Sequence, residues 1–150
     1  MRGGRVALVV LAALATAVGA YLSFERSRGR LPPCPVGGGG CATVQHSRYA
    51  ELVGIPVSTL GMLGGAALLV SVFLRTASAP LVTLTIAFAG ALFSAYLTVL
   101  EAFVIDAWCA WCVTSAVLWC CAAAVAAVRA FRPNPARGPD TSRAEALGPG

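Results

Sequence analysis

Residues 107–128 read AWCAWCVTSAVLWCCAAAVAAV, an apolar run that begins with a Cys-x-x-Cys pair. At 1.5 Å of rise per residue, roughly 20 residues cross a hydrocarbon core about 30 Å thick. Because an irregular chain cannot expose its backbone to lipid, the run predicts a membrane-spanning helix. Cys109 and Cys112, at positions i and i+3, would share one face of that helix, close enough to form a disulfide or to remain a reactive dithiol.

Three further apolar runs of similar length, residues 6–24, 55–74 and 81–100, predict three more spans. The chain of 150 residues is 58% hydrophobic and 11% charged, whereas charged residues make up about a quarter of an ordinary soluble domain. We therefore expect an all-α integral membrane protein, a four-transmembrane-helix bundle over residues 1–130. Residues 131–150 are rich in proline and poor in apolar side chains, which predicts a disordered cytoplasmic tail.

The first run has a competing interpretation as a secretory signal peptide. Arg2 and Arg5 precede its apolar core, and residues 18–20, Val-Gly-Ala, are similar to a cleavage site. The apolar stretch nevertheless continues through Phe24, which gives it nearly spanning length and favours an uncleaved helix.

A second cysteine pair follows the first run. Cys34 lies in a proline-rich, stiff segment, whereas Cys41 follows four consecutive glycines, residues 37–40. Such a segment predicts mobility, with a reach of roughly 10 Å or more at about 3.3–3.6 Å per extended residue. Cys41 is therefore expected to visit Cys109 and return to Cys34, as relayed thiol–disulfide exchange requires.

The arginines predict the orientation in the membrane, because cytoplasmic loops carry an excess of basic residues. They form no single stripe, which argues against a nucleic-acid-binding surface. With both termini in the cytoplasm, the inner arginines are Arg2, Arg5, Arg75, Arg129, Arg132, Arg137 and Arg143, and the outer ones are Arg26, Arg28, Arg30 and Arg48. Both cysteine pairs would then face the extracytoplasmic side, where disulfides persist.

Two shorter features concern the loops. Residues 47–53 predict a short amphipathic helix capped by Ser47, which is either a lid on the membrane surface or a mere connector. The second span, from residue 55, then starts with proline in its first turn. Asp106 is a candidate N-cap of the last helix, which would place Cys109 in the first turn. The helix dipole there favours a thiolate, although the charge of Asp106 opposes it.

Other distinctive residues have a structural interpretation. Gly61 and Gly65, with Gly64 beside them, predict close helix packing. Cys120 and Cys121 are expected to be small packing residues, and His46 a solvated loop histidine.

Taken in order along the chain, these motifs resemble the bacterial branch of the vitamin K epoxide reductase family. The resemblance covers about residues 6–128. The matching residues are Cys34, Cys41, Val44, Ser47, Tyr49, Ala50, Gly54, Ile55, Pro56, Val57, Ser58, Gly61, Cys109, Ala110, Trp111, Cys112, Thr114, Ser115 and Ala116.

The resemblance implies a four-helix bundle around a quinone, with a short horizontal helix in the first extracytoplasmic loop. Cys112 would be the thiolate facing the quinone, and Cys109 its resolving partner. Cys41 would carry the disulfide between Cys109 and Cys34, and Cys34 would exchange with a periplasmic or extracellular thioredoxin-like protein. The acceptor would be ubiquinone or menaquinone in a bacterial inner membrane, and no metal is expected.

Four residues are candidates for quinone binding by position or resemblance: Ser47, Ser58, Trp108 and Trp111. The two tryptophans serve equally well as anchors at the membrane interface. Many bacterial relatives carry a fused thioredoxin-like domain, so a chain that ends in a disordered tail is expected to use a separate partner. Ala116 stands where animal members have an aromatic residue, which favours plain quinone reduction over epoxide reduction.

Three alternatives remain beside the thiol:quinone oxidoreductase. One is a vitamin K epoxide or quinone reductase proper. Another is a membrane protein whose four thiolates hold zinc, with His46 as a substitute ligand, although a glycine-rich segment preorganises a ligand poorly. The third is a structural bundle with incidental disulfides, although stable structural disulfides do not need a mobile loop.

Overall fold

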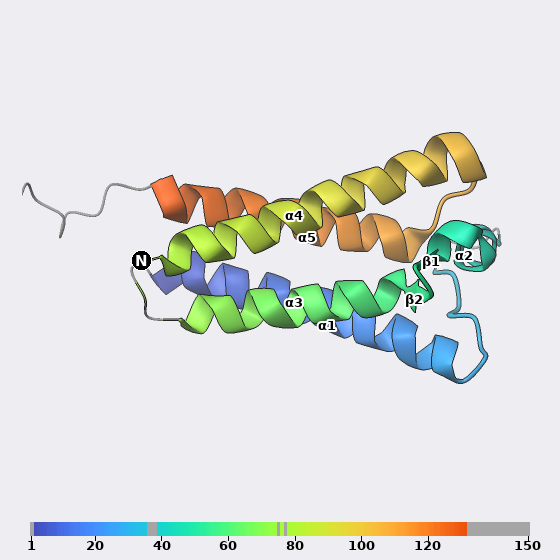
Figure 1. The fold of residues 1–150 in the computed structure, drawn as a ribbon, viewed down its shortest axis with the longest axis horizontal. Helices are drawn as coiled ribbons and strands as arrows, with labels where there is room; N and C mark the ends of the chain where they lie inside the picture. Colours follow the sequence, from blue (N-terminus) through green and yellow to red (C-terminus); the bar gives the residue numbers. More distant parts are fainter. Residues whose placement is uncertain (1, 36–38, 75, 77, 132–150) are drawn as a thin grey trace, which may run out of the picture.

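The computed structural model describes residues 2–35, 39–74, 76 and 78–131 of the chain. Four long helices run side by side in an elongated bundle: α1 (Arg2–Ser27), α3 (Val57–Phe73), α4 (Ala79–Leu100) and α5 (Ala110–Phe131). The short helix α2 (Gly40–His46) and the strands β1 (Glu51–Leu52) and β2 (Ile55–Pro56) gather at one end of this bundle (Figure 1). The predicted tail lies almost entirely outside the described residues.

The long helices have the length and composition of membrane spans. Within the described residues, three segments are long and apolar enough to cross a bilayer: Gly3–Ser27, Ala79–Ile105 and Ala110–Phe131. Helix α3 is equally apolar but has 17 residues, at the short end of the spanning range. Large apolar side chains such as Leu63, Phe88 and Leu92 point outward from the bundle, where a soluble protein would present polar groups. The chain is therefore an all-α membrane protein.

Small residues let the helices approach closely. A Cβ atom on Gly65 of α3 would lie 2.6 Å from Oγ1 of Thr16 in α1, and one on Gly90 of α4 would lie 2.2 Å from the Trp119 ring in α5. The packing role predicted for Gly65 is thus confirmed. The same prediction is wrong for Gly61, because a Cβ there would meet nothing within 4 Å.

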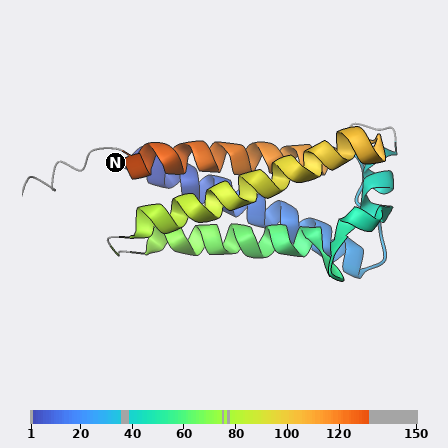
Figure 2. The same cartoon turned by 45° about the horizontal axis from the view of Figure 1, so that its top comes forward.

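The two ends of the bundle differ in which residues they carry. The beginning of α1 and the end of α5 lie at the same end of the bundle (Figure 2). In agreement, a Cβ on Gly4 would be 3.3 Å from Cδ of Arg129. Arg5 stacks over the Phe73 ring at 5.3 Å, so the end of α3 is there too. Helix α2 lies at the opposite end (Figures 1 and 2), and both cysteine pairs cluster there, because Cys41 of α2 packs with Cys109 and with Cys34 and Cys112.

The short helix predicted over residues 47–53 is wrong in its position. The helix instead covers Gly40–His46, and Ser47 ends it, with its hydroxyl donating to the carbonyl oxygen of Val44 at 2.8 Å. A 3-10 turn, Arg48–Ala50, and the antiparallel pair β1 and β2 follow. Gly54, at φ 78°, permits the tight turn between these strands. Because Ile55 and Pro56 form β2, the second long helix begins at Val57 rather than at Ile55.

The connection from α4 to α5 also differs from the prediction. A π-helical turn, Glu101–Ile105, prolongs α4, and Asp106 leaves it in the left-handed conformation at φ 53°. Helix α5 begins at Ala110, and the amide of Val113 donates to the carbonyl oxygen of Cys109 at 3.0 Å. Asp106 therefore ends the preceding turn and is no N-cap, and Cys109 lies directly before the first turn of α5.

Candidate functional site

The four cysteines of the two pairs form one cluster at the end of the bundle. Cys34 and Cys41 are joined by a disulfide, while Cys109 and Cys112 are free thiols. Cys41 and Cys109 are both buried, at 1% and 0% exposure, and pack together with Val44. Cys34 and Cys112 are partly exposed at the edge of this cluster. The fold thus brings the loop pair against the helix pair.

Gly40 explains how α2 comes so close to the beginning of α5. A Cβ atom on Gly40 would lie 2.4 Å from the carbonyl oxygen of Trp108, closer than real Cβ contacts. Gly39, at φ 70°, provides the N-cap of α2. This half of the tetraglycine segment is therefore ordered by packing; residues 37 and 38 lie outside the described part of the chain, and movement of Cys41 stays a prediction.

Trp111, the third residue of the Cys-x-x-Cys segment, ties the Cys34 loop to the bundle. Its indole Nε1 donates to the carbonyl oxygen of Pro33 at 3.1 Å, and its ring lies 5.3 Å from that of Tyr21 in α1. Trp108 points away instead and is 60% exposed, as suits an anchor at the membrane interface.

A buried carboxylate, Glu101, completes the cluster. Its Oε2 accepts a hydrogen bond from the backbone amide of Cys109 at 3.1 Å. A carboxylate oxygen and the Sγ atoms of Cys109 and Cys112 all lie within 4.8 Å of one another. In the sequence, Glu101 lies in the loop between the last two predicted spans, 81–100 and 107–128, and it is not among the predicted site residues. The signal that could have found it is an acid directly after an apolar run and eight residues before the first cysteine of the pair.

Cys109, which precedes the apolar span of α5, is electrostatically tuned by these neighbours. Hydrogen bonding with the Cys112 thiol holds the pKa of the Cys109 thiol below its ordinary value, whereas burial and the Glu101 charge act in the opposite direction. Because the thiolate is the reactive form of cysteine, this arrangement favours nucleophilic chemistry at this end of the bundle.

A pocket opens beside the cluster, between the long helices. The space between its walls is about 760 Å³, a figure that includes volume open to the surroundings, and its lining is mostly apolar. Ser47, Ser58, Trp111 and Cys112 line it, as does Glu101, whereas Trp108 does not. Gly61 also lines it and leaves it open, since no atom occupies the place of a Cβ there. Three of the four candidate quinone ligands thus share one mostly apolar pocket.

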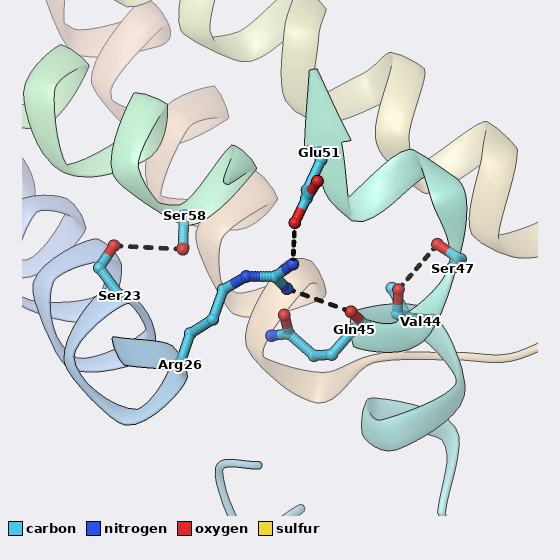
Figure 3. Close-up of polar contacts among 7 residues, drawn as sticks. All are labelled: Ser23, Arg26, Val44, Gln45, Ser47, Glu51 and Ser58. Carbon is cyan, nitrogen blue, oxygen red and sulfur yellow. Dashed lines mark hydrogen bonds and ion pairs between the residues drawn. The ribbon is translucent and has the colours of Figure 1, made fainter. Parts of the chain in front are cut away.

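Arg26, near the end of α1, holds the α2 segment beside this pocket. Its guanidinium donates to the carbonyl oxygen of Gln45 at 3.2 Å and pairs with Glu51 (Figure 3). Nearby, the Ser23 hydroxyl donates to that of Ser58 at 3.1 Å and links α1 to α3. Polar contacts therefore tie the short elements to the bundle where the pocket opens.

The remaining candidates lie apart from the cluster. Cys120 and Cys121 are exposed on α5, so they do not pack within the bundle as the prediction of small packing residues expected. His46 is exposed at the end of α2 and does not line the pocket. Cys34 and Cys41 are bonded to each other, so they offer no thiolate to a metal; in the described part of the chain, the group of potential ligands is Glu101, Cys109 and Cys112.

A family model described as the vitamin K epoxide reductase family matches residues 6–127. The match includes both cysteine pairs, Glu101 and nearly all of the four long helices. Members of this family are membrane oxidoreductases that couple thiols to quinones. The sequence match, the clustered cysteines and the apolar bundle agree, and the chain belongs to the vitamin K epoxide reductase family.

Proposed function

We propose that the protein is a thiol:quinone oxidoreductase that reoxidises a separate thioredoxin-like partner and reduces a membrane quinone, and so supports disulfide bond formation. One observation carries this proposal. The buried Cys41 of the loop disulfide packs against the buried Cys109, while Cys112 faces the pocket. The arrangement suits transfer of an electron pair from the loop to the pocket by thiol–disulfide exchange.

The proposed cycle has three exchanges that balance. The partner's two thiols reduce the Cys34–Cys41 disulfide and leave as a disulfide. The loop thiols then reduce a Cys109–Cys112 disulfide through a mixed Cys41–Cys109 bond, and the Cys34–Cys41 bond forms again. Finally the Cys109 and Cys112 thiols give two electrons and two protons to the quinone. A loop disulfide beside a helix dithiol corresponds to the state before this last step.

The pocket is the proposed quinone site. Apolar side chains from α1, α3 and α4 suit the ring and the beginning of an isoprenoid tail, and Ser47, Ser58 and Trp111 remain candidates for polar contacts. Trp108 is no longer proposed as a direct ligand, because it lies outside the pocket lining.

The proposed topology has four spans, with α3 as the shortest, in a bacterial inner membrane. The ends of α1 and α5 that lie together carry Arg5 and Arg129, and they would face the cytoplasm. Both cysteine pairs would lie on the extracytoplasmic side, where the partner works.

The test is spectrophotometric quinone reduction by the purified full chain in lipid nanodiscs, with a reduced thioredoxin-like donor. Cys112→Ser should abolish turnover while the chain stays folded. Cys120→Ser, on the outer surface of the same helix, is the matched control and should keep the wild-type rate. Wild-type turnover in Cys112→Ser would refute the proposed function.

A further inference from the structure

Glu101 is a buried acid in a segment that otherwise suits lipid. It is 2% exposed, and the span Ala79–Ile105 that contains it is strongly apolar. Ionisable residues inside membrane segments are costly, and they often belong to proton pathways or ligand sites. The π-helical turn that starts at Glu101 is likewise a feature that occurs often at functional sites.

No cation neutralises this carboxylate among the described residues. The two ion pairs found there, Arg26 with Glu51 and Arg30 with Glu25, leave Glu101 out. Its hydrogen-bond donor is the backbone amide of Cys109, and its nearest reactive atoms are two thiol sulfurs. A buried carboxylate without a cation readily takes up a proton. The nearest possible proton donors here are the two thiols.

Glu101 also borders the pocket that we propose as the quinone site. Glu101 and Cys112 both line the pocket, whereas Cys109 does not. The carboxylate therefore borders the proposed quinone site beside Cys112, with an oxygen within 4.8 Å of the Cys112 sulfur. Neither His46, which is exposed, nor Asp106, outside the pocket lining, has this position.

We infer that Glu101 is the catalytic residue that takes the proton from the Cys112 thiol and delivers it to the nearer oxygen of the quinone. This inference rests on the proposed thiol:quinone activity and adds a residue to it. In the last step two S–H bonds break, the Cys109–Cys112 bond forms, and two electrons reduce the quinone. The Cys112 proton passes through Glu101 to one quinone oxygen; the Cys109 proton leaves to water, and water supplies the proton of the other oxygen.

A structural role is the alternative, because Glu101 also holds the Cys109 amide at the beginning of α5. Glu101→Gln separates the two roles. The glutamine carbonyl oxygen still accepts the hydrogen bond of Cys109 in a side chain of the same shape, but the amide takes up no proton. Glu101→Asp keeps a carboxylate at a slightly longer distance.

The experiment measures kcat and KM for a soluble quinone, using the full chain in nanodiscs with a reduced donor. Glu101→Gln should lower kcat by about 10²–10⁴-fold, the usual contribution of general acid–base catalysis, with KM and thermal stability near the wild-type values. Reduction of the Cys34–Cys41 disulfide by the donor should keep its rate. Glu101→Asp should recover part of kcat, and Glu25→Gln, an acid outside the pocket lining, should behave as wild type.

A Glu101→Gln variant with kcat within about twofold of wild type would overturn the inference, given the contribution expected of such catalysis. A loss of stability that accompanies the loss of activity equally in the glutamine and aspartate variants would also overturn it, because it would assign Glu101 a structural role. An inactive wild type would instead refute the proposed function itself, so the two failures are distinguishable.

Discussion

The two cysteine pairs reach the same cluster by different routes. The loop pair lies on a short helix and a proline-rich segment held by a few polar contacts, whereas the helix pair stands at the beginning of a long helix within the bundle. Each pair nevertheless has one buried and one partly exposed cysteine. The buried residues, Cys41 and Cys109, belong to one packed cluster, whereas Cys34 is partly exposed at its edge and Cys112 lines the pocket. The comparison indicates that one cysteine of each pair serves internal exchange and the other serves an external reactant.

The largest loss of activity is expected when a cysteine that serves exchange between the two pairs is removed. We expect Cys41→Ser to abolish quinone reduction driven by the protein donor, because no sulfur then links Cys34 to Cys109. Reduction driven by a small dithiol that reaches Cys112 through the pocket should persist. The comparison of both donors in one quinone assay checks this, and equal loss with both donors would contradict the proposed division.

Two glycines one turn apart in α3 sharpen the contrast between pocket and core. Gly61→Leu should raise the KM for quinone by about tenfold or more, since the side chain would enter the open space of the pocket. Gly65→Ala should instead destabilise the bundle by about 1–3 kcal/mol, because its Cβ would press on Thr16. Quinone kinetics and thermal melting of both variants check the pair, and the reverse pattern would place the ligand elsewhere.

Gly40 tests the contact between the two pairs. Gly40→Ala should push α2 away from the Trp108 carbonyl and slow trapping of a Cys41–Cys109 bond in a Cys34→Ser, Cys112→Ser background by about tenfold. Gly3→Ala is the control, since a Cβ there meets nothing within 4 Å. Trapping at an unchanged rate would show that the close packing of Gly40 is not needed for exchange.

The smallest effect is expected at Arg26. Arg26→Gln removes the ion pair with Glu51, which is partly exposed and worth about 0.2–1 kcal/mol. Turnover should change by less than about threefold, while hydrogen exchange of the α2 amides should become faster. Unchanged exchange in α2 would mean that the disulfide and the packing of Gly40, Cys41 and Val44 hold this segment without the ion pair.

The long helices were predictable because lipid demands long apolar runs, and residues 6–24, 81–100 and 107–128 have them. The cysteine pairs were recognisable from their spacing and order. The short helix was misplaced because its true residues, Gly40–His46, begin with glycine and carry little apolar periodicity, and tertiary contacts stabilise it instead.

The role of Glu101 in the site was missed for a related reason. An acid after an apolar run reads as the beginning of a loop, and a π-helical turn leaves no periodic signal in the sequence. Asp106 was misjudged in a similar way. Aspartate is a preferred N-cap residue, but here it adopts the left-handed conformation, which its residue type alone does not reveal.

The hydrogen bond from Trp111 to Pro33 has a consequence for recovery after each turnover. When the loop disulfide opens, Cys34 is no longer bound to Cys41, but its neighbour Pro33 stays attached to the segment that carries the other pair. The two loop sulfurs then meet at an effective concentration on the order of millimolar, as for short tethers. Attack of the Cys34 thiolate on the mixed Cys41–Cys109 disulfide, which releases the Cys109 thiolate, should thus outpace attack by a stray thiol, and the Trp111 indole would keep Cys34 in position for this step.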